Sequence, residues 1–295
     1  MPRIVSFLPA ATEIVSALGA GGELVGRSHE CDFPSGIEAL PIVSRPALAL
    51  EGLSPQEIDS AINERMATGA SMYAIDEALL QELRPDVILT QNLCRVCAPS
   101  GNELSRAVKS FEVTPEILFL TPQSIADIDE NILAIGRAIG RSTEAAALVA
   151  TNHARINGVN AAVSNAAPRL VVFLEWTDPF FCAGHWVPEM IALAGGHDPL
   201  GRSGADSVRI TPADLEAAAP ELIIVSPCGF QLTHATELAK KMTGAPRVPT
   251  YAVDANAYFA RPGPRIADGI ELLAHLFHPA EVAWPHANTP WSKIA

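Results

Sequence analysis

The chain has 295 residues and a formal net charge of −13 at pH 7. This length is typical of two domains, each large enough to bury a hydrophobic core of its own. Nucleic-acid-binding proteins neutralise phosphates with Lys and Arg, so the acidic balance argues against a nucleic-acid partner. We interpret the negative charge as that of a solvated surface.

The lengths of the apolar runs and the pattern of the cysteines indicate the cellular compartment of the protein. The longest uninterrupted apolar runs have the length of a strand, well below the roughly 20 residues of a membrane-spanning helix. Five cysteines form no regular framework, and only two residues separate Met1 from the first predicted strand. As written, the sequence predicts a cytoplasmic protein that has no signal peptide and spans no membrane. It predicts a periplasmic protein only if a leader has been removed.

The first third of the chain alternates short apolar runs with helical patterns. Continuous apolar runs are typical of parallel strands that are buried on both faces. Ser54-Pro55-Gln56-Glu57 is a capping-box pattern, and Asp76 predicts the cap of a further helix. The predicted strands cover residues 4–8, 24–26, 87–89 and 117–120, and the first predicted helix covers residues 12–18.

The stretch from 122 to 167 is predicted to form linking helices. Thr121 is placed to cap them, with Pro122 at the first helical position. Isoleucines at steps of three and four form one apolar stripe that ends at Gly140, and Ser142 begins a second helical run. The prediction is an N-terminal α/β lobe over 1–121, linking helices over 122–167 and a C-terminal α/β lobe over 168–295. The last helix is expected from about Pro264 to Phe277, followed by an irregular tail.

The sequence on the two sides of these helices repeats. Arg3-Ile4-Val5-Ser6-Phe7-Leu8 is similar to Arg169-Leu170-Val171-Val172-Phe173-Leu174. Gly26-Arg27-Ser28 is matched by Gly201-Arg202-Ser203, and Ser54-Pro55 by Thr211-Pro212, in the same order. The repeat predicts two homologous lobes.

Unusual residues follow the predicted strands. In open α/β sheets, ligands bind outside the carboxyl ends of the strands, so two facing lobes would line one ligand cleft. Tryptophan and tyrosine rings can pack on a macrocycle, an arginine can bind a carboxylate, and a histidine can coordinate a metal. The predicted ligand-binding residues are Pro9, His29, Glu30, Gln91, Trp176, His185, Trp186, Tyr258 and Arg261.

The motifs resemble a known family. Pro9-Ala10-Ala11-Thr12-Glu13 after the first strand, Pro85-Asp86-Val87-Ile88 and Arg261-Pro262-Gly263-Pro264 are similar to the substrate-binding proteins of iron-siderophore and cobalamin ABC transporters. The loop Ser28-His29-Glu30-Cys31-Asp32 and the stretch Gly184-His185-Trp186 resemble the cobalamin-binding branch most. The resemblance implies two Rossmann-like lobes joined by a long rigid helix, as in class III periplasmic binding proteins. It also implies cobalamin as the ligand and an ABC transporter permease as the partner.

Three cysteines leave an alternative open. Cys94 and Cys97 form a C-x-x-C pair after one strand, and Cys31 lies with His29 after another strand. Such sets hold zinc or an iron–sulfur cluster, so the alternative is a cytoplasmic metal- or cluster-bearing protein or enzyme that uses Cys31, Cys94 and Cys97. Buried cysteines also act as small apolar residues. Cys182 and Cys228 are interpreted as structural. The sequence shows no nucleophile elbow, Walker loop or zinc-protease motif, so a binding protein is favoured over an enzyme.

Overall fold

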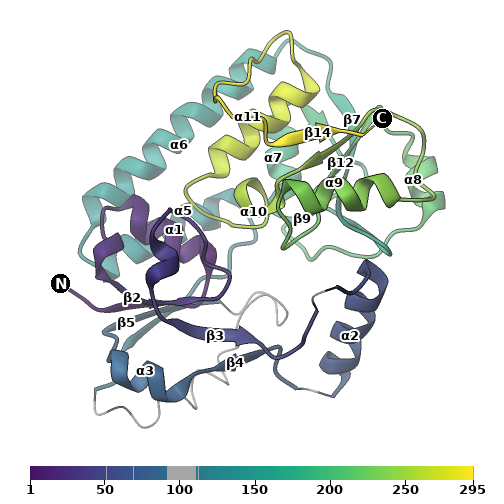
Figure 1. The fold of residues 1–295 in the computed structure, drawn as a ribbon. Helices are drawn as coiled ribbons and strands as arrows, with labels where there is room; N and C mark the ends of the chain where they lie inside the picture. Colours follow the sequence, from purple (N-terminus) through teal and green to yellow (C-terminus); the bar gives the residue numbers. More distant parts are fainter. Residues whose placement is uncertain (51, 69, 92–110, 112, 295) are drawn as a thin grey trace. The chain divides into compact units, whose positions relative to one another are not determined.

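The computed structural model describes residues 1–50, 52–68, 70–91, 111 and 113–294, which are shown in Figure 1. The chain divides into two compact units. The first unit is Met1–Pro122 with Asp127–Ala150, and the second unit is Gln123–Ala126 with Thr151–Ala295. The boundaries predicted at residues 121 and 168 stay a prediction. Within the described ranges, no helix has both the length and the apolar character needed to cross a membrane.

The first unit is built on a sheet with the strand order β4-β3-β2-β1-β5-β6. Neighbouring strands are parallel except for β3 and β4. Strands β1, β2, β5 and β6 form where apolar runs were predicted, whereas β3 and β4 were not predicted. The strands are β1 (Ile4–Ser6), β2 (Leu24–Ser28), β3 (Ile42–Pro46), β4 (Tyr73–Ile75), β5 (Val87–Thr90) and β6 (Glu116–Phe119).

The helices of the first unit begin at the predicted caps. Ser54 and Glu57 form the capping box of α2 (Pro55–Ala67), and Asp76 caps α3 (Glu77–Leu83). Helix α1 (Pro9–Ala17) starts directly after β1 and three residues before the predicted start. Short 3₁₀ turns cover Gly21–Glu23 and Ile37–Ala39. Local side-chain chemistry therefore accounts for two of these helix starts.

The second unit contains a sheet with the strand order β10-β7-β12-β13-β14, and β8 pairs with the end of β7. Strands β10, β7, β12 and β13 are parallel, whereas β8 and β14 are antiparallel to their neighbours. The strands are β7 (Arg169–Thr177), β8 (Phe180–Cys182), β9 (Gly184–His185), β10 (Gly196–His197), β11 (Arg202–Ser203), β12 (Leu222–Val225), β13 (Thr250–Val253) and β14 (Trp291–Lys293).

Helices of the second unit follow its strands. The described helices that come after β7 are α7 (Val187–Leu193), α8 (Pro212–Ala218), α9 (Leu232–Lys241), α10 (Ala255–Tyr258) and α11 (Ile266–Phe277). Thr211 and Asp214 form a capping box at α8, the counterpart of the box at α2. One face of the sheet packs a cluster that includes Val172, Leu215 and Ile223.

The repeat in the sequence corresponds to a repeat in strand order. The order β2-β1-β5-β6 of the first unit matches β10-β7-β12-β13 of the second, with all four strands parallel in each. One detail of the predicted repeat is wrong. Arg27 is buried in β2, whereas Arg202 is exposed in β11, which pairs with β9 outside the main sheet. The Gly-Arg-Ser match therefore does not mark equivalent positions.

The linking segment forms a broken pair of helices, α5 (Ile125–Ala138) and α6 (Ser142–Val163). Gly140 separates them and adopts a positive φ of 69°, a conformation that glycine reaches without steric cost. The predicted start at Thr121 and Pro122 is wrong. The helix begins at Ile125, whose N–H donates to the Glu189 carboxylate at 2.9 Å, so its first turn is stabilised by a residue distant in sequence.

The tail was expected to be irregular, and its last part is a strand instead. Trp291–Lys293 forms β14, which pairs antiparallel with β13 and is drawn in yellow in Figure 1. Trp291 also lies against Trp284 and His275, with ring centroids 5.8 and 5.1 Å apart. Pairing and ring contacts, rather than any periodicity of the tail, determine its path.

Candidate ligand-binding site

Three predicted residues of the first unit lie at one edge of its sheet. Pro9, His29 and Gln91 follow β1, β2 and β5, which are neighbouring parallel strands. From β1 the chain proceeds to β2 and β3 on one side and later crosses to β5 and β6 on the other. Such a reversal of strand order creates a ligand crevice between the strands that flank it. Pro9 and Gln91 follow the two strands at this reversal.

Arg27 organises the loop that carries His29. Its guanidinium donates to the carbonyls of Ser28, His29, Cys31 and Glu38, at 3.0 to 3.4 Å. Arg27 is 7% exposed, and no carboxylate is among its partners in the described ranges. A single planar cation therefore holds the loop in one conformation through backbone carbonyls.

The imidazole of His29 is fixed within this loop. Nδ1 lies 3.2 Å from the Ser44 carbonyl oxygen, and Nε2 lies 3.6 Å from Glu30 Oε1. The ring of Tyr73 is 6.0 Å away between centroids. Burial lowers the pKa of His29, with the charges of Arg45 and Arg27 acting in the same direction and the Ser44 contact opposing them. The neutral imidazole is therefore favoured.

Gln91 places a buried amide at the same edge. The residue is 9% exposed, and its Nε2 has no hydrogen-bond acceptor among the residues that the structure describes. Pro9 begins α1, whose N-cap residue Leu8 provides no side-chain hydrogen bond. The N–H groups of the Gln91 side-chain amide can donate to carbonyl or carboxylate oxygens of a ligand.

The cysteine prediction receives no support. Cys31 is 1% exposed, and its sulfur accepts a hydrogen bond from the Thr12 hydroxyl at 3.1 Å. This is the environment of a small buried residue, and no set of metal-ligating side chains surrounds Cys31 in the described part of the chain. Cys94 and Cys97 lie outside the described residues. Cys182 is buried and Cys228 is exposed.

Trp176 belongs to strand β7 rather than to a loop. It lies two residues beyond Leu174, the last residue of β7 that pairs with β12. Its half-buried ring is 5.6 Å from the ring of Phe230, which is 6.0 Å from that of His234. Sequence reasoning missed Phe230 and His234, although both follow a buried strand and the turn Pro227-Cys228-Gly229.

His185 and Trp186 take different positions although they are adjacent. Trp186 is 6% exposed, and its indole N–H donates to the Phe259 carbonyl at 3.0 Å. This burial assigns Trp186 a packing role, because its ring is enclosed by the unit. His185 remains at the surface, with Nε2 3.2 Å from the exposed carboxylate of Asp206.

Glu175 is a buried carboxyl group beside Trp176. Burial raises its pKa to about 7, the nearby Asp198 charge acts in the same direction, and contacts with the Gly184 N–H and Ser207 oppose them. The Gly184 N–H lies 2.8 Å from Oε1. A Cβ on Gly184 would lie 2.5 Å from the Ser207 backbone nitrogen, so this close approach requires glycine.

Tyr258 and Arg261 lie after β13. The Tyr258 hydroxyl accepts a hydrogen bond from the Asn288 amide at 3.1 Å, and burial raises its pKa. Arg261 is 9% exposed in the segment between α10 and α11. The described structure therefore places Trp176 at the end of β7 and Tyr258 and Arg261 after β13, the two strands that flank β12 in the sheet of the second unit.

Comparison with known proteins identifies the fold. The family model for periplasmic binding proteins matches residues 4–251. This chain belongs to the periplasmic binding protein family. The predicted resemblance and the predicted α/β fold with two sheet-containing lobes are therefore confirmed.

Individual members of the family share little sequence with the chain but most of its length. A vitamin B12-binding protein of Vibrio vulnificus strain CMCP6 is 22% identical over 284 residues, which cover 93% of this chain and 89% of the relative. A periplasmic heme-binding protein from Pseudomonas aeruginosa has a TM-score of 0.73 at 17% identity, covering 100% and 99% of the two chains. The periplasmic vitamin B12-binding protein of Vibrio cholerae has a TM-score of 0.65 at 19% identity, covering 95% and 97%. At these identities, the likeness to the solved structures shows the fold.

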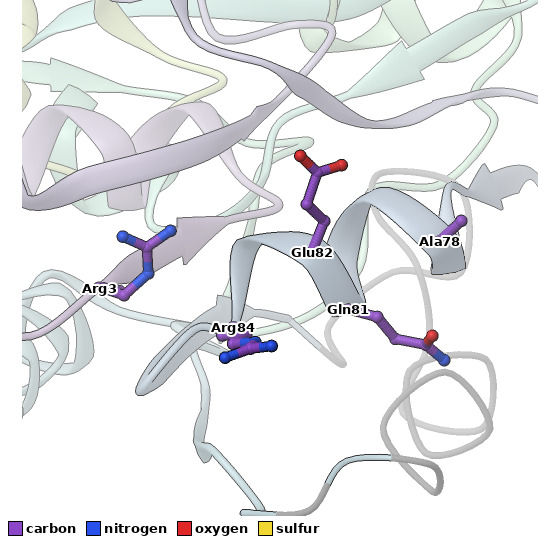
Figure 2. Close-up of a pocket in the computed structure, with 5 residues that line it drawn as sticks. All are labelled: Arg3, Ala78, Gln81, Glu82 and Arg84. Carbon is purple, nitrogen blue, oxygen red and sulfur yellow. The ribbon is translucent and has the colours of Figure 1, made fainter.

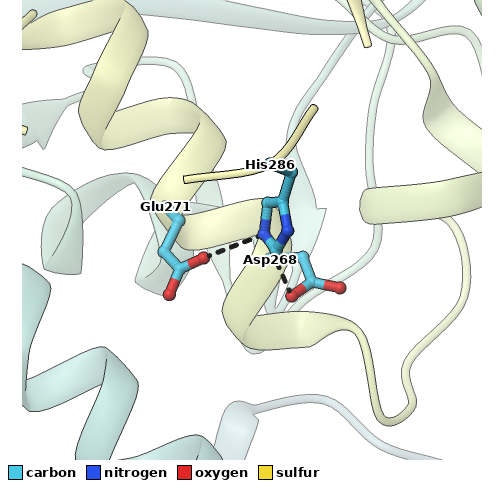
Figure 3. Close-up of side chains that lie close together, drawn as sticks. All are labelled: Asp268, Glu271 and His286. Atoms are coloured by element: carbon cyan, nitrogen blue, oxygen red, sulfur yellow. Dashed lines mark hydrogen bonds and ion pairs between the residues drawn. The ribbon is translucent and has the colours of Figure 1, made fainter. Parts of the chain in front are cut away.

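In this periplasmic binding protein, Asp268, Glu271 and His286 gather at α11, as Figure 3 shows. Their ligand atoms all lie within 4.8 Å of one another. The guanidinium of Arg155 contacts both carboxylates, with two hydrogen bonds to Glu271 of 2.9 and 2.6 Å and one to Asp268. Because a cation already pairs with both acids, we interpret the group as an ion-pair network that attaches α6 to α11.

Arg155→Ala is expected to lower the free energy of unfolding by about 2 kcal/mol, since it leaves two partly buried carboxylates without their cation. Chemical denaturation measures the change. Glu221→Gln is the matched control, because Glu221 pairs with Arg169 in an exposed contact at 3.4 Å, and we expect a loss below about 0.5 kcal/mol. Equal losses in the two variants would contradict the network interpretation.

A surface hollow of about 620 Å³ lies on the first unit, lined by Arg3, Ala78, Gln81, Glu82 and Arg84 (Figure 2). Arg3 precedes β1, and Arg84 lies between α3 and β5. The hollow is therefore beside the amino ends of the strands, opposite the edge where ligands bind in such sheets. We assign the ligand site to the carboxyl edge on this topological ground.

Proposed function

We propose that this substrate-binding protein binds a cobalamin-like corrinoid or a related tetrapyrrole at the carboxyl ends of its strands. The observation that carries the proposal is the half-buried aromatic pair of Trp176 and Phe230 at this edge. Aromatic rings offer flat apolar area at a small cost in side-chain entropy, which suits a planar macrocycle. Trp176 also donates its indole N–H to the Asp178 carbonyl at 3.2 Å, which orients the ring.

The relatives support this class of ligand. One is named for vitamin B12 and a solved structure is named for heme. Both ligands are macrocycles of four pyrrole-derived rings around a metal, with polar groups at the rim. The shared requirement is an apolar platform together with polar groups for the rim, and both are present among the residues described above.

Each predicted residue has a role in this proposal. Trp176 packs on the macrocycle, and Arg261, Tyr258 and Gln91 recognise its rim. In this proposal His29 and Glu30, after β2, and His185, in β9, contact the ligand, and Pro9 positions the start of α1. Trp186 supports the site from the interior of the second unit. We further propose that the loaded protein delivers its ligand to an ABC transporter permease.

Trp176→Ala is expected to weaken binding about tenfold, which corresponds to about 1.4 kcal/mol of lost stacking. Trp176→Phe is the matched control and should stay within about threefold, because it keeps an aromatic face. Calorimetric titration with aquocobalamin and, in parallel, with hemin measures both affinities and identifies the preferred macrocycle. Absence of binding of either ligand to the unmodified protein would exclude the proposed function.

A further inference from the structure

Three segments that carry candidate ligand residues of the second unit meet at Glu175. This residue directly precedes Trp176 in β7. Its backbone carbonyl accepts a hydrogen bond from the Cys228 N–H at 3.1 Å, in the turn that leads to Phe230. Its side-chain Oε1 accepts from the Gly184 N–H at 2.8 Å, at the start of β9. One residue therefore connects the aromatic pair of the candidate site with β9.

The Glu175 carboxyl group also shares a hydroxyl group with β8. The Ser207 hydroxyl donates to the Cys182 carbonyl oxygen at 2.6 Å, and the Ser207 side chain is also hydrogen-bonded to Glu175. Because a carbonyl oxygen can only accept, the single hydroxyl hydrogen of Ser207 lies toward Cys182. The Ser207 oxygen is then left to accept from Glu175, and only a protonated carboxyl group has a hydrogen to donate. The contacts are therefore complete when Glu175 is protonated.

Ionisation of Glu175 leaves this arrangement one hydrogen short. The carboxylate and the Cys182 carbonyl then compete for the one hydroxyl hydrogen of Ser207. In one case an enclosed carboxylate loses a donor. In the other case the oxygens of Ser207 and Cys182 face each other at 2.6 Å with no hydrogen between them. Both arrangements are unfavourable, so loss of the proton weakens the attachment of Ser207.

Ser207 belongs to a segment, residues 205–208, that is hydrogen-bonded to β8 and β9. The Cys182 N–H donates to the Val208 carbonyl at 3.1 Å, and the His185 N–H donates to the Ala205 carbonyl at 2.8 Å. His185 has a positive φ of 52°, an uncommon conformation outside glycine that surrounding contacts have to hold. The position of the His185 imidazole therefore depends on how firmly this segment is attached.

We propose that Glu175 is a positioning residue whose proton holds β9 and residues 205–208 beside Trp176, so that macrocycle affinity is highest when Glu175 is protonated. This inference rests on the proposed function and deepens it, because it adds regulation by pH to the same site. The step is an exchange of one proton with solvent, and no bond to the ligand forms or breaks.

The charges around Glu175 favour retention of its proton near neutral pH. Asp198 accepts three backbone N–H groups, and its charge opposes a second charge on Glu175. Together with burial, this raises the pKa of Glu175 to about 7. His185 and Asp206 pair with each other at 3.2 Å. The titratable residues of the neighbouring segments are Cys182 in β8, His185 in β9, Asp198 after β10, Arg202 in β11, and Asp206 and Arg209 after β11.

The test measures binding of cyanocobalamin and, in parallel, of hemin at pH 6 and pH 8. A group with a pKa of about 7 that must be protonated predicts binding about tenfold weaker at pH 8 than at pH 6. Glutamine has an amide hydrogen for Ser207 and an oxygen for the Gly184 N–H, so Glu175→Gln should vary less than about threefold. Asp178→Asn, an exposed change in the same segment, should retain the tenfold difference.

A measurement without ligand tests the positioning itself. Amide hydrogen exchange of residues 182–208, corrected for the intrinsic effect of pH, should be faster at pH 8 than at pH 6 in the unmodified protein. Glu175→Gln should remove this difference. Ser207→Ala deletes the shared hydroxyl group, so exchange should be fast at both pH values. Thermal melting verifies that each variant is folded.

Three results would overturn the inference and leave the binding function standing. They are equal affinities of the unmodified protein at the two pH values, the same pH dependence in Glu175→Gln as in the unmodified protein, and exchange of residues 182–208 that does not respond to pH. Absence of binding of both macrocycles at both pH values would instead overturn the proposed function, and the exchange measurement would still decide whether the Glu175 proton holds residues 205–208.

Discussion

Replacing Arg27 by alanine is expected to lower the free energy of unfolding by about 4 kcal/mol, the largest effect we predict for a single side chain. The guanidinium donates four hydrogen bonds to carbonyls around the loop of residues 28–38. Hydrogen bonds from a charged donor are stronger than neutral ones, and removing the donor takes a partner from each of these buried or partly buried carbonyls. The loop around His29 should loosen together with the loss of stability.

Urea denaturation of Arg27→Ala measures the effect, and Arg27→Lys tests its geometric origin. Lysine retains the charge but lacks the planar fork, so we expect it to recover less than half of the loss. Arg45→Ala serves as the control for removing a positive charge, since Arg45 is exposed in the adjacent strand β3. A loss in Arg27→Ala no greater than that in Arg45→Ala would show that the carbonyl contacts contribute little.

Glu175→Gln is expected to change how stability depends on pH. Burial raises the pKa of Glu175 from 4.5 to about 7, so the native state binds its proton more tightly than the unfolded state does. Binding of this proton therefore stabilises the native state fully below about pH 4.5, and the stabilisation is lost as the pH rises through about 7. A shift of this size corresponds to about 3 kcal/mol.

Glutamine imitates the protonated side chain and keeps an oxygen that accepts from the Gly184 N–H. The variant should therefore be about 3 kcal/mol more stable than the unmodified protein at pH 8 and nearly equal to it at pH 4.5. Denaturation at several pH values measures the difference in the free energy of unfolding between the two proteins. Because both contain the neighbouring Asp198, its effects largely cancel in that difference. Asp178→Asn, an exposed change in the same segment, should give no such trend. Parallel stability curves for Glu175→Gln and the unmodified protein would refute the prediction.

Local chemistry explains what could be predicted about the fold. The capping boxes at Ser54 and Thr211 and the cap at Asp76 involve residues three apart, so the sequence contains all of their partners. The central strands were also predictable, because burial on both faces requires an uninterrupted apolar run. The sequence placed Pro9, His29 and Gln91 after predicted strands, which was enough to expect a site at the carboxyl ends, and the structure made those strands neighbours.

The sequence by itself therefore determined the α/β class, the central strands and the edge of each sheet that carries the candidate residues. Only the tertiary structure decided which side chains are buried and what they contact. It enclosed Cys31 and Trp186, exposed Arg202 while burying Arg27, and supplied Glu189 to the start of α5. These outcomes depend on partners distant in sequence, and a side chain's burial, hydrogen bonds and pKa follow from its partners in space rather than from its neighbours along the chain.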